Sequence, residues 1–236
     1  MVDMPCEHVY NNVMTPLSSI ITDVSNTTAV APLGADDDSP DSPDSSARRR
    51  EVLEAAARLL AQDGPHGLSL RRVAAEAGGS TQIVYTLFGG KAGLADALYA
   101  EGFDRLARAM RAGLDAAPPS GDPERLVAVG RAYRQFALAE PSFFAVMFGR
   151  AIAGFTPTRL TRAQGRQCTF GQLVEEVQAC LDAGTLVGSS ADELARLCWL
   201  TVHGLAALEA AGMVAAENPD AFIEHVLRAP LLAHRP

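Results

Sequence analysis

Apolar side chains recur at helical spacing from Ala47 onward. A first helix is expected to end at Gly64, a second to begin at Ser69, and a third to run from Ser80 to about Phe88. The positions expected to face the core of these helices are Val52, Leu53, Ala56, Leu59, Leu60, Leu70, Val73, Ala74, Ala77, Ile83, Val84 and Leu87. A glycine pair at 78–79 leaves room only for a tight turn between the second and third helices. This layout predicts a helix-turn-helix.

The remainder of the chain is also predicted to be helical. We expect helices over about 91–116, 123–139, 141–148, 162–183, 190–211 and 219–228, with a loop over 149–157. There is no internal repeat and no convincing strand. The expected fold class is therefore all-α, with an N-terminal three-helix helix-turn-helix domain and a C-terminal helical domain.

Residues 1–46 differ from the rest in composition. They lack helical periodicity and end in the acidic run ADDDSPDSPDSS, which cannot bury apolar surface. We interpret them as a disordered acidic tail, or as the product of a start codon placed too early. A third interpretation is an acidic arm that competes with DNA for a basic surface. The expected domains are thus the tail (1–46), the helix-turn-helix domain (47–95) and the helical domain (96–236).

The net charge is divided unevenly along the chain. The overall value is -8, but residues 1–46 alone carry eight acidic residues and no Lys or Arg. Residues 47–95 carry six Arg and one Lys against four acidic residues, so the basic excess falls on the predicted helix-turn-helix. This distribution is typical of a protein that binds nucleic acid through that segment.

No membrane segment or secretion signal is expected. The chain has no apolar run long enough to cross a bilayer, and residues 1–30 contain no Lys or Arg and no compact apolar block. The four cysteines show no CxxC spacing, so no zinc site is indicated. We therefore expect a cytoplasmic protein without a metal or cofactor.

The third helix presents polar side chains opposite its apolar face. Thr81, Gln82, Tyr85 and Thr86 share this outer face. A glutamine can make a bidentate contact to adenine, and a threonine can offer a hydroxyl or pack on a thymine methyl group. Tyr85 can hydrogen-bond a phosphate. This face is predicted to read base edges in the major groove of DNA.

Other candidate residues are predicted to contact phosphate. Ser69 and Ser80 lie at helix N-termini, where free backbone N–H groups and the helix dipole attract anions. Lys91, the only lysine, falls at the start of the fourth helix and can bind a phosphate. Arg48 begins a run of three arginines, which is either a solvated helix start or an arm that reaches the groove.

Residues 47–95 resemble the DNA-binding domain of TetR-type transcriptional regulators. In that family a Tyr-x-x-Phe-x-x-Lys-x-x-Leu string closes the helix-turn-helix, and this chain has Tyr85, Phe88, Lys91 and Leu94 at those spacings. The resemblance extends through Gly64, Ser69, Val73, Ala74, Gly78 and Ser80, and departs from the family at Gly79 and Leu87. It implies that the residues after about 96 form an all-helical ligand-binding and dimerisation domain.

The sequence around Trp199 and His203 resembles the C-terminal domain of one branch of these regulators. The two residues are four apart and share a helix face. His203 is open to three roles: a core or interface histidine, a hydrogen-bonding partner of an effector, or a metal ligand, which is disfavoured because no second ligand stands at helical spacing. Gly204, Ala207 and Ala211 lie towards another face, where small side chains let a second helix approach closely.

Aromatic residues concentrate in the C-terminal domain, and most of them are expected to be core. Some could instead line an apolar cavity with a few polar contacts, as ligand sites commonly do. We expect the ligand to be an uncharged or weakly polar small molecule. The candidate ligand-binding residues are Tyr133, Phe136, Phe148, Phe170, Trp199 and His203.

The predicted function is that of a TetR-like transcriptional repressor. A homodimer would pair through helices at about 190–211 and 218–228, bind a near-palindromic double-stranded operator and be released by a small-molecule effector. The alternatives are an activator of the same fold, a small-molecule binding protein with a vestigial DNA-binding head, and an enzyme using the helical half. The enzyme is disfavoured because no oriented nucleophile and base are recognised.

Overall fold

The structure is a computed structural model that describes residues 43–188, 190–214 and 219–236. The chain divides into two units between Arg48 and Arg49, and the packing described below belongs to the second unit. The predicted tail, residues 1–46, lies outside the described residues except for its last four positions. Those four belong to the first helix, α2 (Pro43–Asp63), which begins earlier than the expected start at Ala47.

Three helices form the predicted helix-turn-helix region: α2, α3 (Leu70–Glu76) and α4 (Thr81–Phe88), with a 3-10 turn, η1 (Pro65–Gly67), between α2 and α3. The Ser69 hydroxyl accepts a hydrogen bond from the backbone N–H of Arg72 and caps α3 as predicted. Gly78 closes the turn before α4 with a φ of +68°, a conformation that favours glycine.

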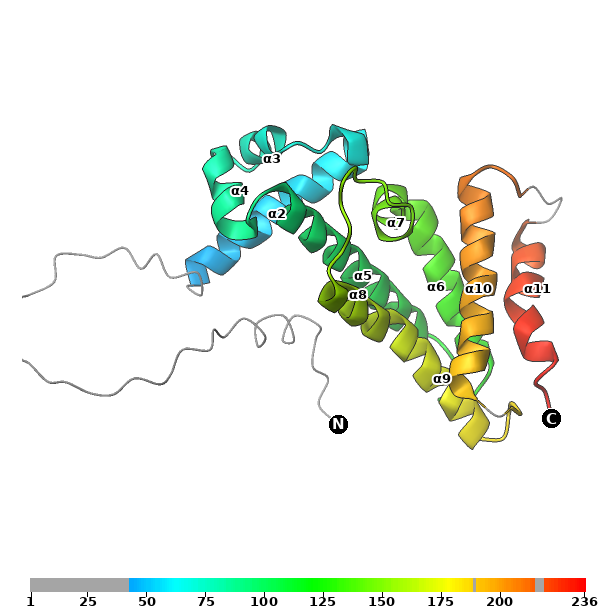
Figure 1. Ribbon diagram of the computed structural model, residues 1–236. Coiled ribbons are helices and arrows are strands. Elements are labelled where there is room, and N and C mark those ends of the chain that lie inside the picture. Colours follow the sequence, from blue (N-terminus) through cyan, green and yellow to red (C-terminus); the bar gives the residue numbers. More distant parts are fainter. Residues whose placement is uncertain (1–42, 189, 215–218) are drawn as a thin grey trace, which may run out of the picture. The chain divides into compact units, whose positions relative to one another are not determined.

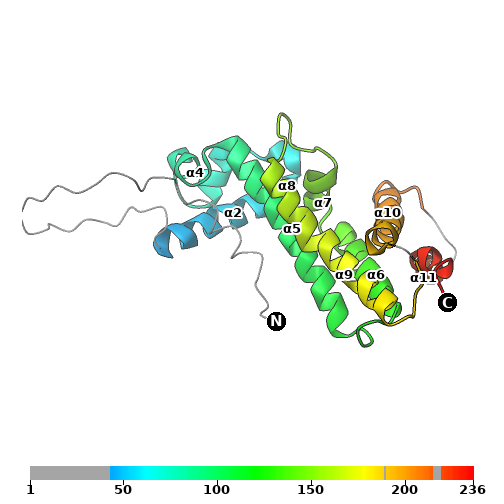
Figure 2. The same cartoon turned by 60° about the horizontal axis from the view of Figure 1, so that its bottom comes forward.

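Helix α5 (Lys91–Asp115) runs from the helix-turn-helix into the C-terminal half (Figure 1). Helices α2, α3 and α4 gather at its N-terminal end, and α6 (Glu124–Ala139) packs along it (Figure 2). The predicted domain boundary at 95–96 falls inside α5. The two predicted domains therefore share one continuous helix.

Six further segments complete the fold: α7 (Pro141–Phe148), α8 (Arg159–Arg166), η2 (Gln167–Gly171), α9 (Gln172–Asp182), α10 (Ala191–Ala210) and α11 (Pro219–Leu232). Segments α8, η2 and α9 follow one another without a break, and η2 is a π-helical turn. Helix α10 packs on α6, α9 and α11. The described residues contain no strand, which confirms the all-α class. None of the described helices combines the length and apolar character needed to cross a membrane.

Some helix ends differ from those predicted. The helix expected to start near position 162 begins at Arg159, because the Thr158 hydroxyl accepts a hydrogen bond from the Thr161 N–H at 3.1 Å and caps the helix. The last helix continues to Leu232, beyond the end expected at position 228. Both differences concern helix termini, where caps and packing decide the boundary.

One apolar core joins the helices of the second unit, from α2, α3 and α4 along α5 to α6, α7, α9, α10 and α11. Gly102 allows α7 to approach α5 closely. A Cβ at Gly102 would lie 2.8 Å from the Met147 sulfur and 3.2 Å from the Phe143 ring. Helix α7 therefore packs directly on the α5 backbone at this position.

Phe143 is fully buried in this core, and the Arg105 guanidinium lies 4.5 Å from its ring centre. We expect Phe143→Ala to lower the free energy of unfolding by about 3–5 kcal/mol, because it removes a buried ring and leaves a cavity. Leu138→Ala, at a position 43% exposed on α6, is the matched control and should change it by less than about 0.5 kcal/mol. Urea denaturation followed by circular dichroism measures both, and equal losses would contradict this placement of the core.

Candidate nucleic-acid interface and internal cavity

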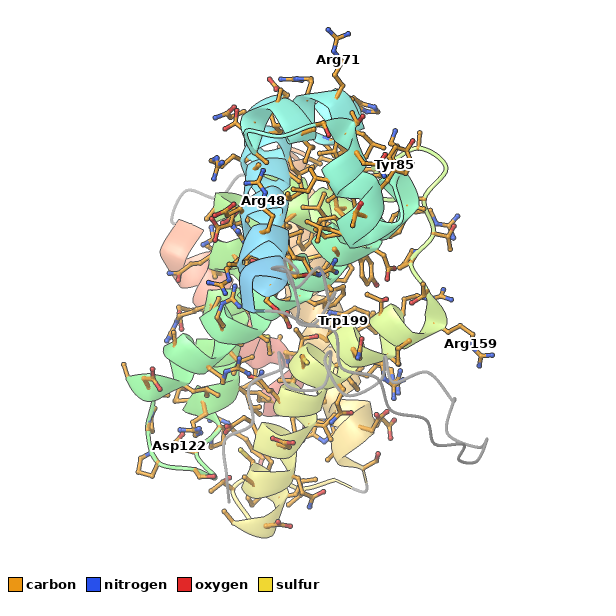
Figure 3. The ribbon with its side chains drawn as sticks, turned by 90° about the vertical axis from the view of Figure 1, so that its left-hand side faces the viewer. Arg48, Arg71, Tyr85, Asp122, Arg159 and Trp199 are labelled. Carbon is orange, nitrogen blue, oxygen red and sulfur yellow. The ribbon has the colours of Figure 1, made fainter. Side chains whose placement is uncertain are left out.

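The outer face of α4 is polar and exposed. Thr81, Gln82, Tyr85 and Thr86 are all exposed, whereas Val84 on the opposite side is fully buried. The Tyr85 side chain is 55% exposed and lies on the outer side of the helix-turn-helix (Figure 3). The four side chains expected to share a face therefore do so, and all four are accessible to a partner.

A glycine pair sets the relation between Tyr85 and Lys91. Gly89 ends α4 with a φ of +68°, and Gly90 has a φ of +104° just before α5. A Cβ at Gly90 would lie 3.1 Å from the Tyr85 ring, so this ring packs on the Gly90 backbone. Lys91 is the exposed first residue of α5. Tyr85 and Lys91 thus flank the same turn.

Arg49 of α2 supports the C-terminal end of α4. Its Nη1 donates a hydrogen bond to the Leu87 carbonyl at 2.5 Å, and its guanidinium lies 4.3 Å from the centre of the Phe88 ring. A cation–π contact of this kind contributes about 0.5–1 kcal/mol at an exposed site. Sequence reasoning missed this role, because the partners are 38 residues apart and nothing local links them.

The remaining phosphate candidates are placed as follows. Ser69 and Ser80 are exposed at the N-termini of α3 and α4, but the Ser80 side chain makes no capping hydrogen bond. Arg48 lies in the first unit, and its DNA contact stays a prediction. Arg71 of α3 was not among the candidates, yet it is exposed and extends away from the ribbon (Figure 3). Its positive charge beside the Ser69 cap was the available signal.

An internal cavity of about 40 Å³ lies among α5, α6, α7, η2, α9, α10 and α11. Four of the predicted ligand-binding residues line it: Tyr133, Phe148, Phe170 and Trp199. Phe136 does not line this cavity. It borders an open groove that is lined by residues of α5 and α6.

His203 does not line the cavity, but it contacts Tyr133, which does. The Tyr133 hydroxyl and His203 Nδ1 are 2.7 Å apart, and the Phe148 ring centre lies 4.7 Å from the His203 ring centre. Burial raises the pKa of Tyr133 and lowers the pKa of His203, so both groups are neutral near neutral pH. With the imidazole proton on Nε2, the phenol O–H donates to Nδ1.

The cavity lining is apolar apart from the Tyr133 and Thr169 hydroxyls, the Cys198 thiol and the Trp199 N–H. Burial raises the pKa of the Cys198 thiol to about 12, so the thiol is uncharged. A volume of about 40 Å³ exceeds the ~10–15 Å³ that a water molecule needs but is far below the ~300–1,000 Å³ of ligand pockets. An occupant of more than a few atoms must therefore displace side chains of the lining.

Helices α10 and α11 leave an apolar face uncovered. Their large apolar side chains with substantial exposure are Leu197, Leu200, Leu208, Phe222 and Leu232. Gly204 lies one helical turn from Leu200, and a Cβ there would meet nothing within 4 Å. The glycine predicted to allow close helix approach is thus not needed for packing within the described chain, and it lies beside the uncovered face.

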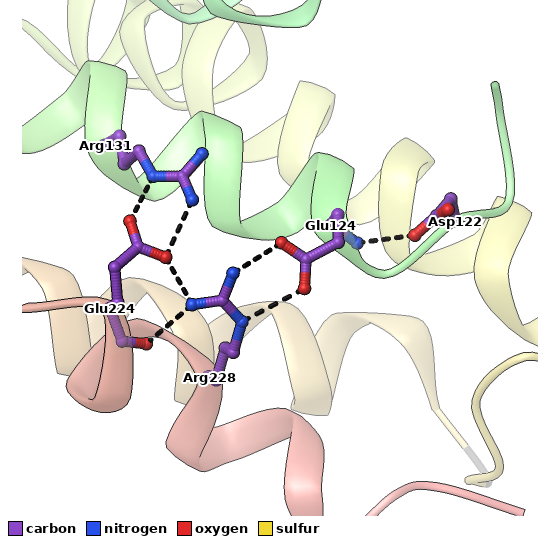
Figure 4. A network of polar contacts seen from close by, with 5 residues as sticks. All are labelled: Asp122, Glu124, Arg131, Glu224 and Arg228. Atoms are coloured by element: carbon purple, nitrogen blue, oxygen red, sulfur yellow. Dashed lines mark hydrogen bonds and ion pairs between the residues drawn. The ribbon is translucent and has the colours of Figure 1, made fainter. Parts of the chain in front are cut away.

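An ion-pair network holds α11 on α6 (Figure 4). Arg131 pairs with Glu224, and Arg228 bridges Glu224 and Glu124, with Nη2 at 2.6 Å from the Glu124 carboxylate. Asp122 accepts a hydrogen bond from the Glu124 N–H at 2.9 Å. The hydrogen bond from Arg131, and then that from Arg228, lowers the pKa of Glu224 to about 2. The network fixes the position of α11 on the domain.

Two family models match the chain. The model of the tetR family of bacterial regulatory proteins matches residues 52–98, and that of the tetracyclin repressor-like C-terminal domain matches residues 126–229. These ranges contain the recognition face of α4 and most of the cavity lining. The chain belongs to the TetR family. The resemblance inferred from the Tyr-x-x-Phe-x-x-Lys-x-x-Leu string is confirmed.

Solved structures share the fold of this TetR-family chain. A protein of unknown function from Rhodococcus sp. RHA1 is 29% identical, with 80% of this chain and 96% of that chain covered and a TM-score of 0.70. A TetR family transcription regulator from Marinobacter aquaeolei VT8 is 19% identical, with 81% and 97% covered and a TM-score of 0.60. One from Haemophilus influenzae RD is 18% identical, with 83% and 100% covered and a TM-score of 0.60. No curated protein matches the chain.

The burial of His203 predicts a pH dependence of stability in this TetR-family protein. Desolvation lowers its pKa in the folded state, so the unfolded chain binds more protons at acid pH, and the free energy of unfolding should fall as the pH drops through about 6.5. His203→Gln removes this titration and should flatten the decline, whereas the exposed His66→Gln should not. Urea denaturation at a series of pH values measures the slope. A wild-type slope in His203→Gln would contradict the assignment.

Proposed function

We propose that the chain is a homodimeric repressor that binds a near-palindromic operator and is released by a small apolar molecule. The observation that carries the proposal is the exposed polar face of α4 on an intact helix-turn-helix. Membership of the TetR family supports DNA binding as the activity. The protein would act in the cytoplasm, where a bacterial chromosome is accessible to it.

Different side chains of the helix-turn-helix would contact base edges and phosphates. Gln82 would make a bidentate contact to adenine, and Thr81 and Thr86 would contact neighbouring bases. Tyr85 and Lys91, on either side of the Gly89–Gly90 turn, would bind phosphates. Base contacts supply sequence preference, whereas phosphate contacts supply affinity and salt dependence.

The uncovered face of α10 and α11 supports a four-helix interface between two copies. Exposed apolar side chains at helical spacing on α10 are typical of an interaction site, and Gly204 leaves room for a second backbone to approach. Two-fold symmetry would then present two recognition helices to half-sites about 34–36 Å apart, or a multiple of that spacing.

The cavity supports a small effector with little or no charge. Its lining carries no charged side chain, and the Tyr133–His203 pair supplies neutral hydrogen-bonding groups. Because the cavity holds only about 40 Å³, an effector would favour an arrangement that differs from the empty one, as allosteric release requires. A coupling of about 1–3 kcal/mol would change operator affinity roughly 5- to 150-fold.

Fluorescence anisotropy tests the DNA-binding part of the proposal. The purified protein is titrated onto the intergenic DNA beside its own gene and onto a scrambled duplex of the same composition, at physiological salt. Preferential binding, with two chains per bound site, supports the proposed repressor. A thermal-shift panel of apolar compounds, followed by anisotropy with each hit, tests the effector. Equal binding to every duplex that is lost as the salt concentration rises would contradict the repressor and favour a small-molecule binding protein with a vestigial DNA-binding domain.

Gln82→Ala and Lys91→Ala should have different effects on DNA binding. Gln82→Ala should cost about 1–3 kcal/mol on the preferred duplex and relax preference at one base position. Lys91→Ala should weaken all duplexes alike and reduce the slope of log affinity against log salt by about one unit. Anisotropy titrations over a range of salt concentrations distinguish the two effects. A Lys91→Ala variant with unchanged affinity and slope would remove Lys91 from the interface.

Leu200→Arg should convert the dimer to a monomer, because it puts a charge into the α10–α11 face. Leu160→Arg is the matched control: Leu160 is 51% exposed on α8 and Leu200 is 55% exposed on α10. Analytical ultracentrifugation reports the oligomeric state of each. A dimeric Leu200→Arg, or loss of the dimer in both variants, would contradict the proposed interface.

A further inference from the structure

The cavity wall and α8 are parts of one continuous helix. Thr169 and Phe170 of η2 line the cavity, and η2 joins α8 to α9 without a break. A π-helical turn is rare and often marks a functional site. Thr161 of α8 and Thr169 of η2 are both buried, at 4% and 7% exposed. The segment therefore carries a buried hydroxyl at each end.

Helix α8 packs directly on α5 at Gly165. A Cβ at Gly165 would lie 2.7 Å from the Phe103 ring, so this ring of α5 packs on the backbone of α8 at this point. The Thr169 hydroxyl donates to the Gly165 carbonyl at 2.8 Å and connects the cavity wall to the same turn. The turn that carries the cavity wall is thus hydrogen-bonded to the turn of α8 that contacts Phe103.

Asp96 of α5 holds the first turn of α8. Its Oδ1 accepts a hydrogen bond from the Thr158 backbone N–H at 3.0 Å, and its Oδ2 accepts one from the Thr161 hydroxyl. The Thr158 and Thr161 hydroxyls are 2.6 Å apart. A carboxylate is favoured at a helix N-terminus by the helix dipole. We refer to Asp96, Thr158 and Thr161 as the latch.

The latch lies close to the DNA-binding helices. Asp96 is five residues after Lys91, in the second turn of α5, and α5 packs against α4. The neighbouring Leu94 and Ala95 are fully buried. The latch is thus attached to the turn of α5 that follows the recognition helix and is anchored in the core.

We propose that Asp96 is a positioning residue that transmits the state of the cavity to the DNA-binding helices. The inference rests on the proposed function, since it takes the cavity to be the effector site. An occupant that displaces Phe170 moves η2 and α8 together. The latch then shifts the first turns of α5, and with them α4 and Lys91. Asp96 contacts neither the occupant nor DNA and acts through Thr158 and Thr161.

A purely structural cap has different consequences. If the latch only stabilises α8, opening it lowers stability but leaves the response of α4 to the cavity unchanged. If it transmits movement, opening it removes that response. A double-mutant cycle distinguishes the two cases, because it compares how much filling the cavity changes α4 when the latch is intact and when it is opened.

A substitution that fills the cavity can replace the unidentified effector in this test. Val129→Phe puts an aromatic ring into the cavity wall, and a space of about 40 Å³ cannot accept it without rearrangement. Val129→Ala, which enlarges the cavity, controls for lost stability. Thr161→Val deletes the latch hydroxyl, Thr161→Ser keeps it, and Asp96→Asn weakens the latch from the other side.

Two properties are measured for each single and double variant of the full chain. One is hydrogen exchange of the backbone amides of α4 and the first turns of α5, without DNA. The other is the dissociation constant for a duplex enriched from a random library by the wild-type protein. We expect Val129→Phe to change the exchange of α4 and to weaken DNA binding at least about fivefold. With Thr161→Val or Asp96→Asn added, both effects should shrink, to less than about twofold for DNA. With Thr161→Ser added, they should remain in full.

Equal responses to Val129→Phe with and without the latch would overturn the proposal and leave the DNA-binding function intact. Unchanged exchange and affinity in Val129→Phe would overturn it as well, as would a similar response to Val129→Ala. Failure of the wild type to enrich any duplex would refute the proposed function separately, because hydrogen exchange needs no DNA. If Val129→Phe shows no cooperative thermal transition, Val129→Ile supplies a smaller filling group for the same exchange measurement.

Discussion

Continuous packing along α5 is the constraint on which the rest of the structure depends. Near its start, fully buried Leu94 and Leu98 pack in the core beneath the recognition helix. Further along, Leu106 and Met110 line the internal cavity. A helix of 25 residues spans about 37 Å and is stiff over that length. The helix-turn-helix and the cavity are therefore both built on α5. Neither half can be repacked without affecting the position of α5.

Ion pairs join helices in both halves of the chain. In the helical half, Arg125 pairs with Glu176 and Arg134 pairs with Glu209, each through two short hydrogen bonds between partly buried side chains. Such bidentate pairs are stronger than hydrogen bonds between neutral groups, and they join α6 to α9 and α10. Among the described residues, no ion pair involves Lys91 of the head. In the helix-turn-helix region Arg58 pairs with Glu76 and Arg72 pairs with Asp63, whereas Lys91 stays exposed where a polyanion would bind.

The candidate site could be predicted as far as it depends on neighbours along one helix. Thr81, Gln82, Tyr85 and Thr86 share a face because a helix repeats every 3.6 residues, and the glycines at 78 and 89 mark its two ends. Trp199 and His203 share a face for the same reason. Phe136 was grouped with Tyr133 from composition alone, but the rotation of α6 places it against α5. The contact of Arg49 with Leu87 and Phe88 had no local signal at all.

By itself, the sequence determined which segments are helical, where most of them begin and end, and which side chains the recognition helix exposes. These properties follow from local rules: the period of apolar residues, the capping preference of serine and the turn preference of glycine. The tertiary structure alone decided the volume of the cavity, the π-helical turn in its wall and the hydrogen bonds from Thr158 and Thr161 to Asp96. Each of these depends on how helices that are distant in the sequence pack and rotate against one another. Helical periodicity is compatible with many such arrangements, and close packing of the side chains selects one of them.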